Sequence, residues 1–422
     1  MLTLKIIRDQ TEMVCKRLAV KRFDAAGIVQ TILSLDDKRR SLQTATDGAL
    51  AEQKGLAKQI GKLMQLGKYE EAEAVKMSAL AGKELVKTWE TELQIVSHQL
   101  HETMLLLPNL PSEFVPEGKG EDQNMVVRED RSLCKLEESL PHWEVALKYH
   151  LIDFDGGVKI AGAGFPVYKG RGARLQRAII SYCLDFNTSA GYLEVQPPLM
   201  VNETSAYGTG QLPDKEGQMY GVDADHFFMI PTSEVPVTNL YRDVIVEPKE
   251  LPVKMTAYTP CFRREAGSYG KDVRGLNRLH QFDKVEIVQI QRPEESYRAL
   301  DEMVAHVEQL VKSLHLPYRI VRLCGGDLSF ASALTYDFEV WSAGQERWLE
   351  VSSVSNFESF QANRLKLRYR DEQQKIQLLH TLNGSALALP RIVAALLENH
   401  YTPHGVVIPE VLRPYTHFDL ID

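Results

Sequence analysis

The chain has 422 residues, of which 44% are hydrophobic and 25% charged, and its formal net charge is −8 at pH 7. This composition is that of an ordinary globular protein with enough residues for two or more domains, and the negative charge argues against indiscriminate nucleic-acid binding. No segment approaches the ~18 consecutive apolar residues that a membrane span needs. Because the N-terminus also lacks a signal-peptide pattern, we expect a cytoplasmic protein without a membrane anchor.

The five cysteines, at positions 15, 134, 183, 261 and 324, never form a CxxC pair. An odd number of cysteines without such spacing indicates neither a disulfide framework nor a zinc cluster. We therefore expect reduced, mostly buried thiols and no zinc.

A heptad pattern of apolar residues starts near Ile28, breaks at residues 67–69 and stops before Pro108. Two heptad segments of similar length joined by a short break predict an antiparallel coiled-coil hairpin over about 26–107. Residues 38–68 hold seven basic and two acidic side chains, so one face of the first helix could meet phosphates. For this segment alone, a dimerisation or spacer role is the more common interpretation.

Glu234 follows Thr232 and Ser233 and precedes an apolar segment. These two hydroxyls and one carboxylate are typical of a helix N-cap followed by a first-turn acid. The same groups could bind a small zwitterion, with the carboxylate taking the ammonium group.

The stretch 259–290 has the strongest charge pattern in the chain. Residues 258–262 and 281–290 are predicted strands, and the polar loop between them contains Gly267, Gly270 and Gly275. Its charged residues are Arg263, Arg264, Lys271, Arg274 and Arg278 against Glu265 and Asp272. Arginine binds phosphate in a planar fork, so this hairpin suits a polyanion, although charge alone is more typical of a solvated basic hairpin.

Glu350, followed by Ser352 and Ser353, is expected near a strand end. One interpretation is an edge strand with exposed polar residues, and the other is a set of oxygen ligands for a hard cation.

Near the C-terminus, Asn383, Gly384 and Ser385 predict a turn, and Pro390 predicts the first turn of a helix. Arg391 would oppose the dipole at that helix N-terminus by about 0.3–1 kcal/mol. We therefore expect an anion to bind beside it.

Three segments carry a resemblance to class II aminoacyl-tRNA synthetases. The FRxE at 262–265 with HQFDKVE at 280–286 resembles motif 2 (about 255–290), and REAGSYGKDVRGLNRLHQFDKVE is similar to the seryl branch in particular. A predicted helix and strand over about 173–200, with Pro198 at the family's proline position, resemble motif 1. The segment 381–400 resembles motif 3.

This resemblance covers essentially the whole chain and implies an α+β fold. An N-terminal tRNA-binding domain, 1–110, would carry the antiparallel coiled-coil arm. A catalytic domain, 111–422, would contain an antiparallel sheet flanked by helices.

The function implied by the resemblance is that of a serine tRNA ligase. ATP and Mg²⁺ would activate L-serine to seryl adenylate, and serine would pass to the 3′ end of tRNA(Ser), with tRNA(Sec) left open as a second substrate. The arm and the motif 2 loop would bind the tRNA. A homodimer would form through motif 1 around Pro198.

The resemblance also implies site residues, with Arg263 and Arg391 as the catalytic pair. The implied ATP-binding residues are Arg263, Arg264, Glu265, Phe282, Glu350, Val351, Ser352, Ser353 and Arg391, and Glu350 and Ser353 would hold the Mg²⁺. The implied serine-binding residues are Thr232, Ser233, Glu234, Arg263, Glu286, Asn383 and Ser385.

The chain departs from the family pattern at a few positions. Ala386 and Pro390 stand where the family has Gly, Ser329 where Gly is usual, and Val354 where Cys is usual. These changes bear on the local loop shape and leave the charges intact.

Two other functions are consistent with parts of the sequence. One is a synthetase paralogue that activates an amino acid for a carrier protein, against which the long arm counts. The other is a non-catalytic coiled-coil RNA-binding protein with a decayed synthetase domain, against which the intact Arg263, Glu265, Glu350 and Arg391 count.

Overall fold

The computed structural model describes residues 1–132, 139–214, 217–265 and 274–422. The chain divides into two compact units, Leu2–Ala19 with Phe23–Pro108, and Met1 and Val20–Arg22 with Asn109–Asp422. No helix in the described part of the chain is long and apolar enough to cross a bilayer. The predicted loop residues Gly267, Gly270, Lys271 and Asp272, and Cys134, lie outside the described residues.

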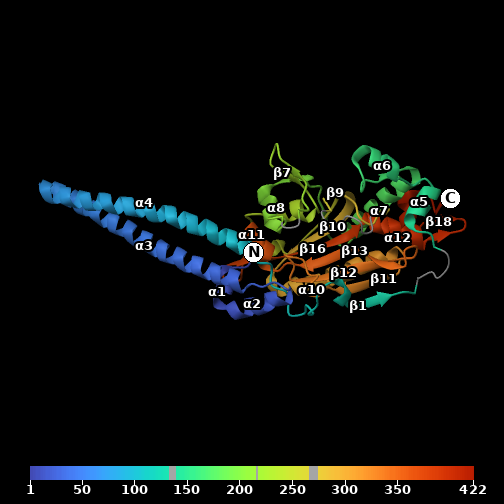
Figure 1. Cartoon of the computed structure of the whole chain (residues 1–422), viewed down its shortest axis with the longest axis horizontal. Coiled ribbons are helices and arrows are strands. Elements are labelled where there is room, and N and C mark those ends of the chain that lie inside the picture. Colours follow the sequence, from blue (N-terminus) through green and yellow to red (C-terminus); the bar gives the residue numbers. More distant parts are fainter. Residues whose placement is uncertain (133–138, 215–216, 266–273) are drawn as a thin grey trace. The chain divides into compact units, whose positions relative to one another are not determined.

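The first unit is helical and contains a long hairpin. Its helices are α1 (Leu4–Asp9), α2 (Thr11–Val20), α3 (Ala26–Gln65) and α4 (Tyr69–Leu105). Helices α3 and α4 run side by side (Figure 1) and pack through the heptad positions, which are buried or half-buried. Gly67 reverses the chain with a φ of +69°, a conformation that favours glycine. The predicted antiparallel hairpin is confirmed.

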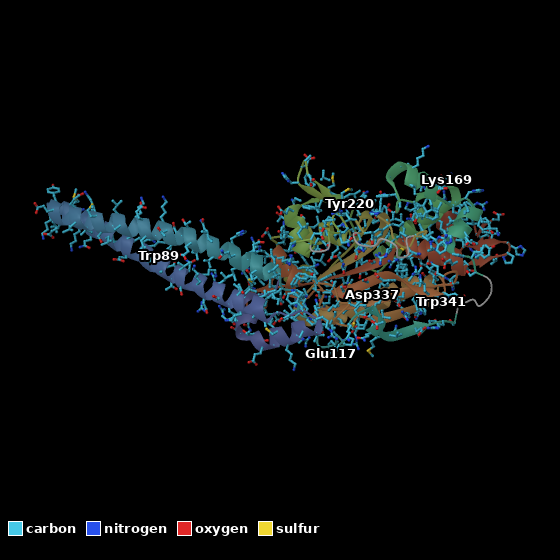
Figure 2. The ribbon with its side chains drawn as sticks, in the orientation of Figure 1. Trp89, Glu117, Lys169, Tyr220, Asp337 and Trp341 are labelled. Carbon is cyan, nitrogen blue, oxygen red and sulfur yellow. The ribbon has the colours of Figure 1, made fainter. Side chains whose placement is uncertain are left out.

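Polar contacts hold the base of this hairpin. Asp36 on α3 is only 2% exposed. Arg8 of α1 donates to it at 3.0 Å and Arg39, one turn later on α3, at 2.8 Å. Further along, Lys38 of α3 and Glu92 of α4 form an ion pair at 2.8 Å, and Trp89 of α4 is half-buried (Figure 2). The carboxylate is therefore neutralised where the hairpin meets α1.

The second unit is built on an eight-stranded sheet with the order β1-β11-β12-β13-β16-β10-β9-β4. Every neighbouring pair is antiparallel except β4 with β9. The strands are β1 (Met125–Asp130), β11 (Tyr318–Arg322), β12 (Leu334–Ser342), β13 (Arg347–Asn356), β16 (His380–Ala388), β10 (Gln281–Gln291), β9 (Val253–Phe262) and β4 (Leu193–Glu194). The predicted sheet is confirmed.

Helices bury one face of this sheet (Figure 1). They include α5 (His142–Lys148), α7 (Gly170–Ser189), α10 (Ser296–Ser313) and α12 (Leu389–Asn399). Side chains alternate along β10, so Val285 and Ile287 enter the apolar core while Lys284 and Glu286 point to the other face. The functional residues gather on that second face.

Smaller elements complete the unit. The remaining helices are α6 (Phe154–Ala161), α8 (Glu203–Thr209), α9 (Glu234–Asn239), α11 (Ser359–Leu365) and α13 (Arg413–Thr416), with short 3₁₀ turns at Glu121–Gln123, Pro248–Glu250, Pro293–Glu295 and Glu410–Leu412. The remaining strands pair as β2 (Ile152–Asp153) with β3 (Val167–Tyr168); β5 (Met200–Asn202), β7 (Phe227–Met229) and β6 (Gly221–Val222); β15 (Ile376–Leu378), β14 (Arg368–Arg370) and β8 (Ile245–Val246); and β17 (Tyr401–Thr402), β18 (Gly405–Val407) and β19 (Leu420–Ile421).

The turn predicted at Asn383, Gly384 and Ser385 is wrong, because these residues lie inside strand β16. Gly384 pairs with Ile287 of β10 on one side and with Val354 of β13 on the other. The local turn signal is overridden by hydrogen bonding to two neighbouring strands. Glycine fits here because the flanking side chains leave little room for a Cβ.

We expect Gly384→Val to lower the free energy of unfolding by about 1–3 kcal/mol, because overpacking a filled core forces its neighbours to shift. A Cβ at this position would lie 3.2 Å from Val354 Cγ2 and 3.4 Å from Ile287 Cγ1. Urea unfolding of the variant and the parent chain measures the difference. Gly384→Ala is the control with the smaller loss. A valine variant as stable as the parent would contradict tight packing around β16.

Candidate active site

A cavity of about 620 Å³ opens on the polar face of the sheet. Both predicted catalytic arginines, Arg263 and Arg391, line it. The other predicted residues that line it are Thr232, Glu234, Glu265, Phe282, Glu286, Glu350, Val351, Ser352, Ser353, Asn383 and Ser385. Ser233 and Arg264 are not among its lining residues. The structure thus brings most of the predicted site together from distant parts of the chain.

Strand pairing positions the central part of this site. Phe282, Lys284 and Glu286 follow each other at every second position of β10 and all line the cavity. Strand β16 contributes Ser385, which is paired directly with Glu286, and Asn383 two residues earlier. The sheet therefore holds an aromatic ring, an ammonium and a carboxylate in a row along β10, with two polar groups beside them on β16.

One end of the cavity is a buried charge cluster. Lys284 Nζ lies 2.5 Å from Glu286 Oε2 and donates to Thr232 Oγ1 at 2.9 Å. The Thr232 hydroxyl lies 3.3 Å from the same Glu286 oxygen. Glu286 Oε1 is buried and has no hydrogen-bond partner within the described residues. An unpartnered carboxylate oxygen that faces a cavity is suited to a ligand that donates a hydrogen bond.

Lys284 is a member of this cluster that the sequence analysis did not assign. It is only 5% exposed, which is rare for lysine unless it is paired. The sequence could have indicated Lys284, because it precedes Glu286 by two residues on a predicted strand and that spacing puts both side chains on one face.

Glu234 adds a second carboxylate to the same end. Burial, reinforced by the negative charge of Glu286, raises the pKa of Glu234 to about 7. Gln361 Nε2 donates to its Oε1 at 2.6 Å. The adjoining Ser233 is fully buried, and its side chain caps no helix. The N-cap interpretation therefore fails for Ser233, whereas Thr232 Oγ1 does accept the Glu234 N–H at 3.3 Å.

The two arginines lie beyond this cluster, and their surroundings differ. The backbone N–H of Arg263 donates to His280 O at 2.9 Å, and the Arg263 guanidinium lies over the Phe282 ring, 5.2 Å from its centroid. Arg391, in the first turn of α12, donates to Glu350 O at 2.7 Å and to Asn277 O at 3.3 Å. Both guanidiniums are held at the cavity wall, where an anion could reach them.

A β-bulge creates the predicted cation-binding pair. Glu339 of β12 faces Glu350, and Phe338 faces Ser352, so Val351 is an extra residue on β13. The extra residue puts Glu350 and Ser353, three positions apart, on one face. The Ser353 hydroxyl donates to Glu350 Oε1 at 3.2 Å. Strand β13 lies between β12 and β16, but its pairing with β16 covers only residues 354–356, so Glu350 and Ser353 belong to the part of β13 that is paired with β12 alone.

This pair offers oxygen atoms to a hard cation, and Glu350 is exposed to the cavity. Carboxylate and hydroxyl oxygens fit Mg²⁺, which keeps waters and phosphate oxygens as its other ligands. No group of three or more His, Cys, Asp or Glu side chains in the described ranges could hold a metal ion by itself. A cation here would therefore depend on oxygens supplied by a bound phosphate.

Asp337 of β12 (Figure 2) is opposite Ser353 of β13 in the strand register. Burial and then the negative charge of Glu350 hold the pKa of Asp337 well above its usual range. The sequence analysis did not single out this residue. The geometry adds a buried carboxyl group beside the exposed Glu350.

Family comparisons agree with this architecture. The family described as "tRNA synthetase class II core domain (G, H, P, S and T)" matches residues 220–400, and "Seryl-tRNA synthetase N-terminal domain" matches residues 1–111. The antiparallel sheet and its cavity are thus the core of a class II aminoacyl-tRNA synthetase.

Individual relatives show which branch of the class II synthetases this chain resembles. A serine–tRNA ligase of Salinibacter ruber is 50% identical over 99% of this chain and 98% of its own, and one of Akkermansia muciniphila is 44% identical over 100% and 99%. The chain belongs to the seryl-tRNA synthetase family. The predicted family and enzyme class are confirmed.

Solved structures show the same similarity. The seryl-tRNA synthetase from Pyrococcus horikoshii complexed with ATP matches with a TM-score of 0.93 at 32% identity, covering 100% of this chain and 99% of that one. The cytoplasmic serine–tRNA ligase from Naegleria fowleri in complex with AMP matches with a TM-score of 0.88 at 25% identity, with the same coverage.

The raised pKa of Glu234 gives a prediction for stability against pH. A protonated Glu234 is favoured in the folded chain, so its contribution to stability is fully present below pH 4.5 and is lost as the pH rises to about 7. Glu234→Gln stays neutral throughout. We expect its stability, relative to the parent, to improve by up to about 3 kcal/mol across this window, as measured by urea unfolding at several pH values. A difference that is independent of pH would contradict the assignment.

Proposed function

We propose that this chain activates L-serine with ATP and transfers it to tRNA(Ser). The observation that carries the proposal is that Arg263 and Arg391, 128 positions apart in the chain, line one cavity together with Glu234 and Glu286. Two guanidiniums suit a polyphosphate, and two carboxylates suit an ammonium group. A cavity of about 620 Å³ has the size of typical ligand sites.

In the first step, a serine carboxylate oxygen attacks the α-phosphorus of ATP. A bond forms between these two atoms, and the bond from the α-phosphorus to the bridging oxygen breaks, which releases pyrophosphate. Arg263 would stabilise the charge that builds on the α-phosphate, and Arg391 would hold the γ-phosphate. No side chain becomes covalently attached, so catalysis is positioning plus electrostatic stabilisation.

Glu350 and Ser353 would hold the Mg²⁺ that accompanies ATP. Bound there, the ion would neutralise phosphate charge and polarise the phosphoryl oxygens. Phe282 supplies an aromatic face for the adenine ring, and Glu265 can accept its exocyclic amine. Val351 and Ser352 line the same cavity and would complete the ATP-binding set.

Selection of serine would depend on the buried charge cluster. Glu234 and Glu286 Oε1 can accept from the ammonium group, and Thr232, Asn383 and Ser385 are available for the substrate hydroxyl. A site built to bind a hydroxyl can reject an analogue without one by as much as ~10⁴, because its buried polar groups lose their partners. Threonine would be refused by volume, a weaker filter of about 1–3 kcal/mol.

In the second step, a 3′-terminal hydroxyl of the tRNA attacks the seryl carbonyl carbon, and AMP leaves. We assign tRNA recognition to the N-terminal domain, residues 1–110, and to the motif 2 loop of the catalytic domain, residues 111–422. Lys54, Lys58 and Lys62 support this assignment, because they are exposed and follow each other at every fourth position of α3.

The remaining parts of the proposal concern assembly and substrate range. We expect a homodimer formed through motif 1 around Pro198, and a reaction that takes place in the cytoplasm, where tRNA is used. The carrier-protein and non-catalytic alternatives are not favoured, because the chain matches serine–tRNA ligases over its full length. Charging assays with tRNA(Ser) and tRNA(Sec) would show whether tRNA(Sec) is a second substrate.

We expect Arg263→Ala to lower serine-dependent ATP–pyrophosphate exchange by about 10³-fold, because the transition state loses a charged donor. Arg264→Ala is the matched comparison, since that neighbouring side chain is not among the residues lining the cavity. It should lose far less activity. Normal exchange by Arg263→Ala, with an unchanged melting temperature, would remove Arg263 from the site.

The arm gives a separate prediction. Changing Lys54, Lys58 and Lys62 to Glu should raise the KM for tRNA(Ser) at least tenfold at ~0.1 M salt and leave ATP–pyrophosphate exchange unchanged, because phosphate contacts depend on positive charge. A triple change on α4, at Lys76, Lys83 and Lys87, is the matched control for net charge. Equal effects of the two triple variants would show that only total charge matters.

A further inference from the structure

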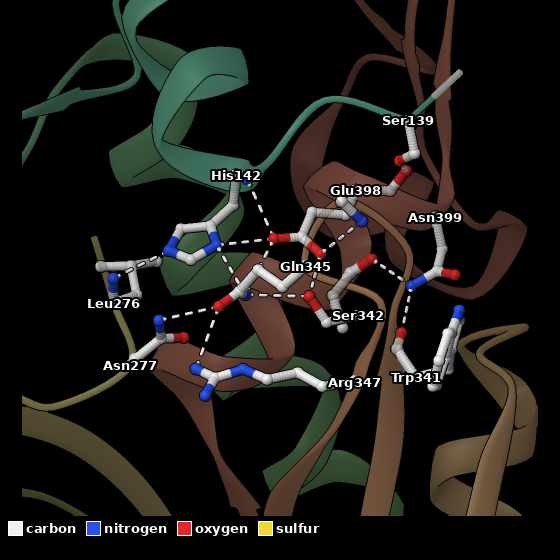
Figure 3. A network of polar contacts seen from close by, with 12 residues as sticks. Ser139, His142, Leu276, Asn277, Trp341, Ser342, Gln345, Arg347, Glu398 and Asn399 are labelled. Carbon is white, nitrogen blue, oxygen red and sulfur yellow. Dashed lines mark hydrogen bonds and ion pairs between the residues drawn. The ribbon is translucent and has the colours of Figure 1, made fainter. Parts of the chain in front are cut away.

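A buried network of polar side chains lies next to the cavity (Figure 3). Its centre is His142 at the start of α5, with an exposed fraction of 0%, and Glu398 near the end of α12, at 1%. His142 Nδ1 and Glu398 Oε1 are 2.7 Å apart, and the His142 N–H donates to the same oxygen at 3.0 Å. Neither residue lines the cavity or has a part in the proposed reaction.

The hydrogen bonds fix the tautomer of His142. Its Nε2 accepts the backbone N–H of Leu276 at 2.8 Å, so the ring proton is on Nδ1 and is donated to Glu398. The second Glu398 oxygen accepts from the Ser342 hydroxyl and from the Gly344 N–H. Burial opposes ionisation of Glu398, but these donors outweigh it and lower its pKa. Each polar atom of the pair is therefore satisfied.

Leu276 and Asn277 connect this network to the site. They line the cavity directly after the motif 2 loop. Asn277 O accepts from Arg391 Nε at 3.3 Å, and its side-chain amide donates to Gln345 Oε1 at 2.9 Å. The main chain of these two residues is thus held by His142 at Leu276 and contacts Arg391 at Asn277, while Gln345 holds the Asn277 side chain.

Helix α12 is attached to this segment at two places. Arg391 and Glu398 are seven residues apart, two helical turns, and so lie on the same side of α12. Arg391 contacts Asn277 directly, and Glu398 contacts Leu276 through His142. A helix that is held at two points on one side has little freedom to rotate, and so its N-terminal arginine stays in place.

The backbone at Gly275 passes very close to the His142 ring. Gly275 has a φ of +65°, and a Cβ there would lie 2.1 Å from His142 Nε2. Only glycine lets the backbone pass this close to the ring. The approach of the loop stem to His142 is therefore fixed by both residues.

We propose that His142 and Glu398 are positioning residues that hold the Leu276–Asn277 main chain and, through it, the guanidinium of Arg391 that meets the phosphates of ATP. This inference rests on the proposed function, because it assigns ATP to the Arg391 end of the cavity. The Thr232, Glu234 and Glu286 cluster comes from other elements. Loss of the His142 contact thus acts on ATP and leaves serine binding as it is.

Two substitutions separate the contacts of His142. Asparagine places an amide near the Nδ1 position, so His142→Asn can still donate to Glu398 but cannot reach the Leu276 N–H. Glutamine is longer, so the oxygen of His142→Gln can still accept from Leu276. We expect His142→Asn to raise the KM for ATP about tenfold with an unchanged KM for serine, and His142→Gln to restore most of the loss.

A second measurement avoids turnover. The dissociation constant for Mg·ATP, determined by equilibrium dialysis without serine, should rise by the same factor in His142→Asn. His306→Asn is the control: it removes a half-buried histidine whose Nε2 lies 2.8 Å from Asn187 Oδ1. It should lower the melting temperature and leave both KM values unchanged.

An unchanged ATP affinity in His142→Asn, or equal increases in the KM values for ATP and serine, would overturn the proposal. If this variant does not fold, Gly275→Ala displaces the same segment and is expected to weaken ATP binding in the same selective way. Failure of the proposed function would appear differently, as absence of serine-dependent exchange by the parent chain. The ATP dissociation constants would still decide the role of His142.

Discussion

The antiparallel pairing of β10 with β9 and β16 is the constraint on which the site depends. It sets Glu286 opposite Ser385, keeps Phe282, Lys284 and Glu286 on one face, and brings the β9 end with Arg263 beside that row. A slip of one residue would turn the entire row into the apolar core. The buried side chains on the opposite face, such as Val285 and Ile287, prevent this slip because they fill the space below the helices.

The charge balance at the buried end explains what the cavity can accept. Glu234 and Glu286 provide two carboxylates, and Lys284 provides one ammonium, which is paired with Glu286. Burying a second carboxylate without a partner is costly, and the pKa of about 7 for Glu234 expresses that cost. A ligand ammonium group would supply the missing positive charge. With two carboxylates and one ammonium among its own side chains, this end of the cavity suits a ligand that brings one more positive charge, such as the ammonium group of an amino acid.

Much of this arrangement was predictable from the sequence, for reasons that differ between elements. The heptads gave the α3–α4 hairpin because their period reports directly which face is buried, and Arg391 stood out because its charge opposes a helix dipole. The pairing partners of Gly384 were not predictable, since hydrogen bonds to strands distant in sequence override the local turn preference. The same holds for the bulge at Val351, which alone lets Glu350 and Ser353 share a face, and for His142, whose partners lie more than 130 residues away.

Long-range contacts also position the side chains at the end of the cavity that contains Arg391, Glu350 and Ser353. Arg391 Nη1 lies 3.6 Å from Glu350 Oε2, and Glu350 Oε1 accepts from Ser353. The residues assigned to phosphate and to Mg²⁺ therefore form an ion pair with one another at the cavity wall. A magnesium nucleotide carries both complementary charges, so it can replace this internal pair with one contact to each partner. The backbone carbonyls of Asn277 and Glu350 also accept from Arg391, so its guanidinium is positioned by main-chain contacts that do not depend on this ion pair.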